Sequence, residues 1–175
     1  MAHESRPRTL DPENLGPLET WLADRIGADS LKIEKAELLS GGAIGENWRL
    51  DAWVEGGGHH GKQNWVLRTD AATRMAMSHD RANEFACLNA GHDAGVLVPE
   101  PIAECANAGL IGAPFMVVGY VVGYAQGHKM VRDPAIEKAG SALAEALGSQ
   151  LAKIHSVRPP GNGLGFLALP EKSPA

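Results

Sequence analysis

The chain has 175 residues, of which 44% are hydrophobic and 21% charged, so it can bury a core and has the composition of an ordinary globular protein. Its formal net charge of −5 gives no support for nucleic-acid or anionic-membrane partners. Because no segment resembles a bilayer span or a signal peptide, we expect a cytoplasmic protein in which Cys87 and Cys105 are reduced and buried or partly buried.

The first part of the chain predicts one helix and three strands. Residues 1–14 are expected to be disordered, and an amphipathic helix is predicted over about 15–26, stopped by the glycine that follows it. Residues 31–39 and 48–54 alternate as strands do, and "NWVLR" at 64–68 is a third strand after a glycine-rich turn.

The second part predicts a helix over 75–90 that ends near Gly91, and then strands within 96–105 and 112–122. Prolines interrupt the first of these strands, which favours a position at the edge of the sheet. A long helix is predicted to begin at Asp133-Pro134, since Asp is a good N-cap and Pro is tolerated in the first turn. Its apolar stripe is expected to stay exposed in this chain, and it consists of Ile136, Gly140, Leu143, Leu147, Leu151 and Ile154.

The stretch "LSGGAIGENW" at 39–48 places three glycines between two predicted strands. Clustered glycines allow positive φ and expose N–H groups that can cradle phosphate oxygens. A P-loop needs Lys-Ser/Thr after its last glycine, but Glu46-Asn47 follows here, and a dinucleotide fingerprint would have to open a helix. A kinase-type flap, which joins two antiparallel strands over the phosphates, fits the pattern. An ordinary hairpin loop remains the alternative.

A kinase-type site also needs a cation on the third strand and an acid on the following helix that orients the cation. Arg68 ends the predicted third strand and Glu84 lies in the next predicted helix. Each residue alone is commonly a solvated surface charge. Their order and their placement on the right elements favour the functional interpretation.

Six segments, in this order, resemble the N-terminal half of the aminoglycoside phosphotransferase-like family, which are small-molecule kinases with a protein-kinase-like fold: "LLSGGAIGENWRLD", "WVLR", "EFACL", "VPEPIAEC", "LIGAPFMVVGYVVG" and "LGSQLAKIHSV". The similarity runs from about residue 36 to 158. It implies an α+β fold with a five-stranded antiparallel sheet and a C-type helix in a nucleotide-binding N-lobe at 15–122. The hinge end and the first long helix of an incomplete catalytic lobe would occupy 123–175.

The resemblance also implies a nucleotide site. The loop over the phosphates would consist of Ser40, Gly41, Gly42, Ala43, Ile44 and Gly45. Arg68 would replace the strand-three lysine and pair with Glu84, and its guanidinium can grip two phosphate oxygens at once. The Gly119 carbonyl and the Val121 N–H would bond the edge of adenine.

The family's H-G-D-x-x-x-x-N catalytic loop and its later metal-binding Asp are missing from the sequence. We therefore assign no catalytic residue and no metal ligand, and we expect ATP and Mg²⁺ as cofactors with the metal ligands outside this chain. His79-Asp80 and His92-Asp93 have the wrong spacing and are interpreted as surface or capping residues, and His155 as structural. His59-His60 is interpreted as solvated, because no third metal ligand accompanies it.

The sequence thus predicts the nucleotide-binding part of an ATP-dependent phosphotransferase that acts on a hydroxyl group of a small molecule. This chain alone is expected to be inactive, as a fragment, a truncated gene product or one half of a split protein. The alternative is a non-catalytic nucleotide-binding or interaction module derived from the same family. The acceptor and the choice between ATP and GTP stay open.

Overall fold

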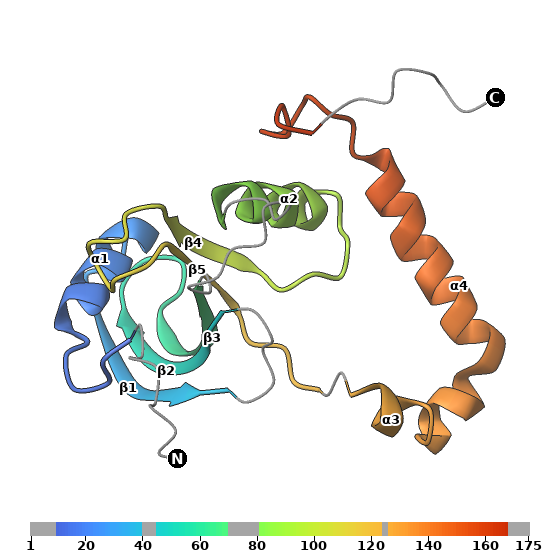
Figure 1. Ribbon diagram of the computed structural model, residues 1–175, viewed down its shortest axis with the longest axis horizontal. Helices are drawn as coiled ribbons and strands as arrows, with labels where there is room; N and C mark the ends of the chain where they lie inside the picture. The colour runs from blue at the N-terminus through green and yellow to red at the C-terminus, as the bar shows by residue number, and fades with distance from the viewer. Residues whose placement is uncertain (1–9, 40–44, 70–80, 124–125, 168–175) are drawn as a thin grey trace, which may run out of the picture. The chain divides into compact units, whose positions relative to one another are not determined.

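The computed structural model describes residues 10–39, 45–69, 81–123 and 126–167 (Figure 1). The elements follow one another as α1 (Gly16–Ile26), β1 (Ser30–Leu38), β2 (Asn47–Glu55), β3 (Gly61–Thr69), α2 (Arg81–Asp93), β4 (Pro101–Cys105), β5 (Phe115–Gly119), α3 (Gly127–Met130) and α4 (Pro134–Ser156). The chain divides into two compact units, the first formed by 1–85 with 101–120 and the second by 86–100 with 121–175. Residues 86–100, which we expected in the nucleotide-binding part, therefore group with the C-terminal segment.

The first unit is built on a five-stranded sheet with the order β1-β2-β3-β5-β4. Every neighbouring pair of strands is antiparallel, as expected. β4 lies at one edge and begins at Pro101, where a missing N–H removes no bond from the interior of the sheet. The edge position predicted from the prolines is thereby confirmed.

One face of this sheet forms the core of the first unit. Because side chains alternate along a strand, β2 buries every second residue, and its buried residues are the predicted Trp48, Leu50, Ala52 and Val54. α1 contacts β1 and β4 (Figure 1). The rings of Trp21, on α1, and Phe115, on β5, meet edge to face with their centroids 5.1 Å apart. The predicted helix of the nucleotide-binding lobe was the C-type helix at 75–90, but α1 is the helix that covers the core.

The N-terminal end of the described chain belongs to this core. Leu10 is only 2% exposed and packs in the cluster with Leu15 and Leu18. The expectation that residues 1–14 are disordered is therefore wrong for 10–14, where the buried side chain of Leu10 ties the segment to the core. Residues 1–9 lie outside the described part of the chain.

The buried carboxylate of Glu19 fixes α1 to β1. Its Oε1 accepts the backbone N–H of Ile33 at 2.8 Å and lies 3.1 Å from Lys32 Nζ. Glu19 is 9% exposed, so a lost partner would leave a poorly hydrated charge. Both contacts keep α1 in one register over the strand.

α2 ends three residues later than predicted, at Asp93 instead of Ala90. Gly91 lies inside the helix, and the stop comes at Gly95, which has φ 73°. The N–H of Gly95 donates to His92 O and the N–H of Val96 to Gly91 O, both at 2.9 Å, which is the Schellman pattern. An interior glycine costs a helix about 1 kcal/mol, which is too little to end it. The part of the predicted helix at 75–80 lies outside the described residues.

α4 begins as predicted, with the Asp133 carboxylate accepting the N–H of Ala135 at 2.8 Å. At Gly140, however, φ is 46° and ψ is −123°, so the helix is broken there and the expected continuous stripe is interrupted. Beyond the break the predicted exposure is confirmed for Leu147, Leu151 and Ile154, which are 50–61% exposed, whereas Leu143 is half-buried. The short α3 was not predicted.

Two hydrogen bonds join α4 to the loop after α2 within the second unit. Gln150 Oε1 accepts the N–H of Leu97 at 2.8 Å, and Lys153 Nζ donates to Gly95 O at 2.7 Å. Beside them is a mostly apolar cavity whose lining includes Val96, Val98, Ile154 and Leu164. No helix among the described residues is long and apolar enough to span a membrane.

Candidate functional site

The glycine-rich stretch connects two paired antiparallel strands. The N–H of Leu39 donates to Asn47 O at 2.8 Å, which closes the base of the loop. Ser40, Gly41, Gly42, Ala43 and Ile44 lie outside the described residues. Gly45 has φ 89°, a left-handed conformation that favours glycine. The loop therefore enters a strand rather than a helix, as the kinase-type flap requires.

Glu46 and Thr69 tie the end of this loop to the end of β3. The N–H of Thr69 donates to Glu46 O at 2.9 Å, and the N–H of Glu46 donates to Thr69 Oγ1 at 3.2 Å. The Glu46 carboxylate accepts the indole N–H of Trp48 at 2.8 Å. These bonds hold the last glycine of the loop next to the strand end that carries Arg68.

The register of β2 and β3 decides which face Arg68 occupies. Arg68 is opposite Asn47, and Val66 is opposite Arg49, so these four side chains share one face. The buried residues of β2, from Trp48 to Val54, lie on the other face, which is the core face. Arg68 thus projects from the face opposite the core, on the strand end that Thr69 ties to Glu46.

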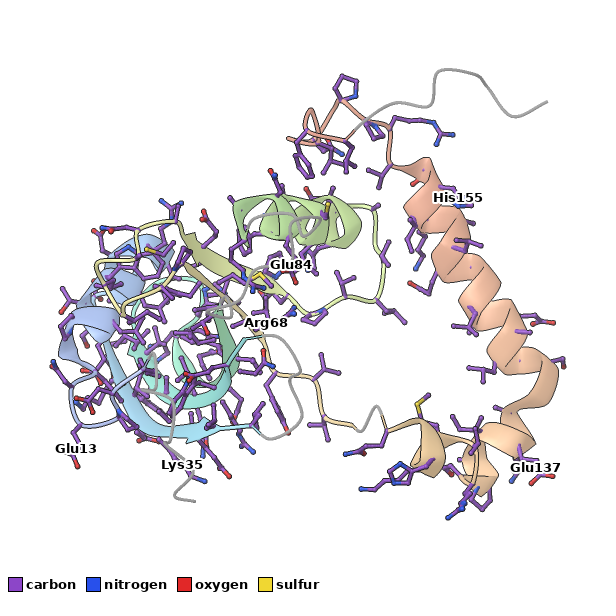
Figure 2. All side chains as sticks on the ribbon, in the orientation of Figure 1. Glu13, Lys35, Arg68, Glu84, Glu137 and His155 are labelled. Atoms are coloured by element: carbon purple, nitrogen blue, oxygen red, sulfur yellow. The ribbon has the colours of Figure 1, made fainter. Side chains whose placement is uncertain are left out.

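The pair predicted from the sequence is present. Arg68 Nη1 lies 2.9 Å from Glu84 Oε1, and Figure 2 shows the two labelled side chains close together between β3 and α2. The side chains are 39% and 36% exposed, so water screens the attraction and the pair adds little stability by itself. Its effect is instead to orient the Arg68 guanidinium, whose other N–H groups can receive an anion.

A second arginine, Arg81, also binds the Glu84 carboxylate, and it was missed in the interpretation of the sequence. Arg81 is 8% exposed, its Nη1 donates to Glu84 Oε2 at 2.6 Å, and its Nη2 donates to Thr69 O at 3.0 Å. The two oxygens of Glu84 are thus shared between two arginines. The i, i+3 spacing of Arg81 and Glu84 was a signal for this pair, since such residues are neighbours on a helix.

The end of β5 carries the predicted base-binding segment. The N–H of Tyr120 donates to Asn64 O at 3.0 Å, and Gly119 is opposite Trp65. Gly119 and Trp65 therefore form a non-hydrogen-bonded pair, in which the Gly119 carbonyl is directed away from β3. Val121 is 65% exposed and belongs to the second unit. The roles of Gly119 and Val121 stay predictions.

Arg49 lies near this segment, on the same face as Arg68. Its Cζ is 4.8 Å from the centroid of the Tyr120 ring, and its Nε is 2.9 Å from Asp51 Oδ1. The Asp51 carboxylate holds the pKa of the Arg49 guanidinium above its usual value. No motif in the sequence pointed to a role for Arg49.

The remaining candidates are exposed or lie outside the described residues. His92 and Asp93 are exposed at the end of α2, as expected for surface residues, and His79-Asp80 lies outside the described part. His155 is exposed on α4 (Figure 2). No group of three metal-ligating side chains occurs among the described residues.

Cys105 is buried, as expected. The same expectation is wrong for Cys87, which is exposed. Cys87 lies on α2 and lines the apolar cavity of the second unit. The apolar pattern of a helix does not by itself determine whether so small a side chain is buried.

The phosphotransferase enzyme family is the family whose model matches this chain, over residues 35–171. The chain belongs to the phosphotransferase enzyme family. This confirms the family resemblance, and the sheet and helices of the first unit confirm the kinase-like α+β fold.

A solved structure supports the same fold. It is a candidate aminoglycoside phosphotransferase from Ralstonia eutropha JMP134, with 20% sequence identity and a TM-score of 0.56. The match covers 90% of this chain and 42% of the other, so this chain spans less than half the length of the phosphotransferase it resembles. At this identity the likeness shows the fold alone. No curated protein matches the chain.

Proposed function

We propose that this phosphotransferase-family chain carries the nucleotide-binding part of an ATP-dependent kinase that acts on a hydroxyl group of a small molecule. The observation that supports the proposal best is the Arg68–Glu84 pair, at 2.9 Å, on the strand face next to the end of the glycine loop. A cation there can neutralise phosphate, and its acidic partner keeps it aimed.

In this proposal the six residues from Ser40 to Gly45 cover the phosphates with backbone N–H groups. Arg68 binds phosphate oxygens, and Gly119 and Val121 offer a carbonyl and an N–H to the edge of the base. Mg²⁺, the usual companion of ATP, would neutralise the phosphates when bound. The sequence lacks the family's metal-binding Asn and later Asp, and for that reason we propose that the Mg²⁺ ligands lie outside this chain.

Nucleotide titration tests the role of Arg68. We expect the wild-type chain to bind ATP weakly, because these groups contact only one side of the nucleotide and water screens the charges. Arg68→Ala should raise the ATP dissociation constant about tenfold, because it removes charge-assisted hydrogen bonds, which contribute about 1.5–3 kcal/mol. NMR titration measures millimolar affinities of this kind.

His92→Ala is the control, because His92 is exposed at the end of α2, where we place no nucleotide contact. It should bind ATP as the wild type does. Equal affinity of Arg68→Ala and wild type, or no ATP binding by the wild type at millimolar concentrations, would contradict the proposed site.

A second candidate function is a nucleotide-binding module without catalysis, which is favoured by one feature of the sequence. The 175 residues contain no H-G-D-x-x-x-x-N motif, so no Asp is available at the position that would orient the attacking hydroxyl. Both candidates therefore predict that this chain alone transfers no phosphate.

The transfer assay uses labelled ATP with a panel of sugars, amino alcohols and hydroxy acids. We expect no labelled product from the 175-residue chain. Phosphate transfer by a longer polypeptide that adds the missing motif would favour the kinase. No transfer by that polypeptide would favour the nucleotide-binding module without catalysis. Turnover by this chain that is lost in His92→Ala or Asp93→Ala would place the active site elsewhere.

A further inference from the structure

The face that carries Arg68 also carries Arg49, a second arginine with its own set of partners. Its Nε bonds Asp51 Oδ1 at 2.9 Å, its Nη2 lies 3.4 Å from Asn64 Oδ1, and its Cζ lies 4.8 Å above the ring of Tyr120. We infer that Arg49 is a positioning residue for nucleobase recognition, because it fixes the segment from Gly119 to Val121 that would receive the base. This inference rests on the proposed function and adds a specificity determinant to it.

The anchors of Arg49 are rigid. Asp51 follows it by two residues on β2 and Asn64 lies on β3, directly opposite Asp51 in the register. Both groups are therefore part of the central strands of the sheet. A guanidinium bonded to a carboxylate and an amide has a defined plane, which the flexible ammonium of a lysine would lack.

Asn64 links this anchor to the segment itself. Its side-chain oxygen faces Arg49, while its backbone carbonyl accepts the N–H of Tyr120 at 3.0 Å. Tyr120 is thus held by a backbone bond and by its ring under the guanidinium. It is the last residue of the first unit, and Val121 is the first residue of the second. The bond of the Tyr120 N–H therefore fixes the peptide that joins Gly119 to Tyr120.

The alternative is that Arg49 binds phosphate directly, as we propose for Arg68. The register argues against this. Arg68 is opposite Asn47, which lies two residues from Gly45 of the loop. Arg49 is opposite Val66 instead, and its guanidinium contacts Tyr120, the residue that follows the C-terminal end of β5. Arg49 is also engaged by a carboxylate, an amide and a ring, and binding phosphate would disturb these contacts.

Three ligands separate base recognition from phosphate recognition: ATP, adenosine and inorganic tripolyphosphate. Arg49→Met keeps most of the aliphatic stem and removes the planar cation. We expect it to weaken adenosine and ATP about fivefold, in line with a lost cation–π contact, and to leave tripolyphosphate unchanged. Arg68→Ala, the matched variant on the same face, should show the reverse selectivity, with weaker tripolyphosphate and ATP and unchanged adenosine.

Amide hydrogen exchange supplies a readout that does not depend on a ligand. In Arg49→Met the exchange of the Tyr120 N–H should accelerate about tenfold, because the bond to Asn64 O opens more often. Arg49→Lys should show a smaller loss than Arg49→Met in both measurements, since it keeps a cation near the Tyr120 ring and loses the guanidinium plane. Arg25→Met, on an exposed position of α1, is the control for loss of an arginine.

The outcomes distinguish the inference from the proposed function. If the wild type binds neither ATP nor adenosine, the proposed function fails and the inference fails with it. If the wild type binds both, the inference alone is overturned when Arg49→Met binds adenosine normally. It is also overturned when Arg49→Met weakens tripolyphosphate as much as ATP, which would make Arg49 a phosphate ligand. Unchanged exchange at Tyr120 would overturn it whatever the affinities.

Discussion

Trp65→Ala is expected to lower the free energy of unfolding of the first unit by about 3–5 kcal/mol, the usual cost of deleting a buried aromatic side chain. Trp65 is 1% exposed, on the face of β3 that lies in the core. Removing its ring leaves a cavity that strands on both sides cannot fill by a small shift. Since whole domains are stable by only about 5–15 kcal/mol, the variant should be close to unfolded at room temperature.

Trp53→Ala is the matched control, because Trp53 lies on the neighbouring strand β2 and is 43% exposed. Surface substitutions usually change stability by about 0.5 kcal/mol or less. Urea unfolding followed by far-UV circular dichroism avoids the fluorescence of the mutated residue. Equal midpoints for the two variants would show that Trp65 and Trp53 do not lie on opposite faces of the sheet.

Arg81→Met is expected to destabilise the first unit by about 2–3 kcal/mol. The substitution removes the guanidinium that donates to Glu84 Oε2 and to Thr69 O. A buried carbonyl oxygen that loses its hydrogen-bond donor costs about 1–3 kcal/mol. Breaking a fully buried ion pair costs about 3–5 kcal/mol, but Glu84 is 36% exposed and can recover some hydration. The expected loss is therefore below that range.

The variant should also affect the nucleotide site, because Glu84 would keep only Arg68 as an ionic partner among the contacts described above. We expect weaker ATP binding together with the loss of stability. Arg25→Met, the same substitution on an exposed face of α1, should change the unfolding midpoint little. A stable Arg81→Met variant with wild-type ATP affinity would show that Arg81 supports neither the helix nor Glu84.

Features that depend on nearby residues were predicted well from the sequence. The buried set of β2 follows from the two-residue period of a strand, and Asp133 caps α4 because its carboxylate reaches an N–H two residues away. The pair of Arg68 and Glu84 was also predicted, because a strand end and the following helix give it a defined place in a kinase-like fold. The family followed from the order of short segments.

Features that depend on distant segments were decided by the tertiary structure. Leu10 is buried because a core formed by later strands is there to receive it, and Arg81 matters because the Thr69 carbonyl ends a strand at its side. The stop of α2 at Gly95 instead of Gly91 depends on a Schellman turn whose Val96 is buried in the second unit. The contact of Arg49 with Tyr120 joins residues 71 positions apart in the sequence. Local propensities amount to about 1 kcal/mol or less per residue, so a few kcal/mol of burial or ion pairing between distant segments decides such positions.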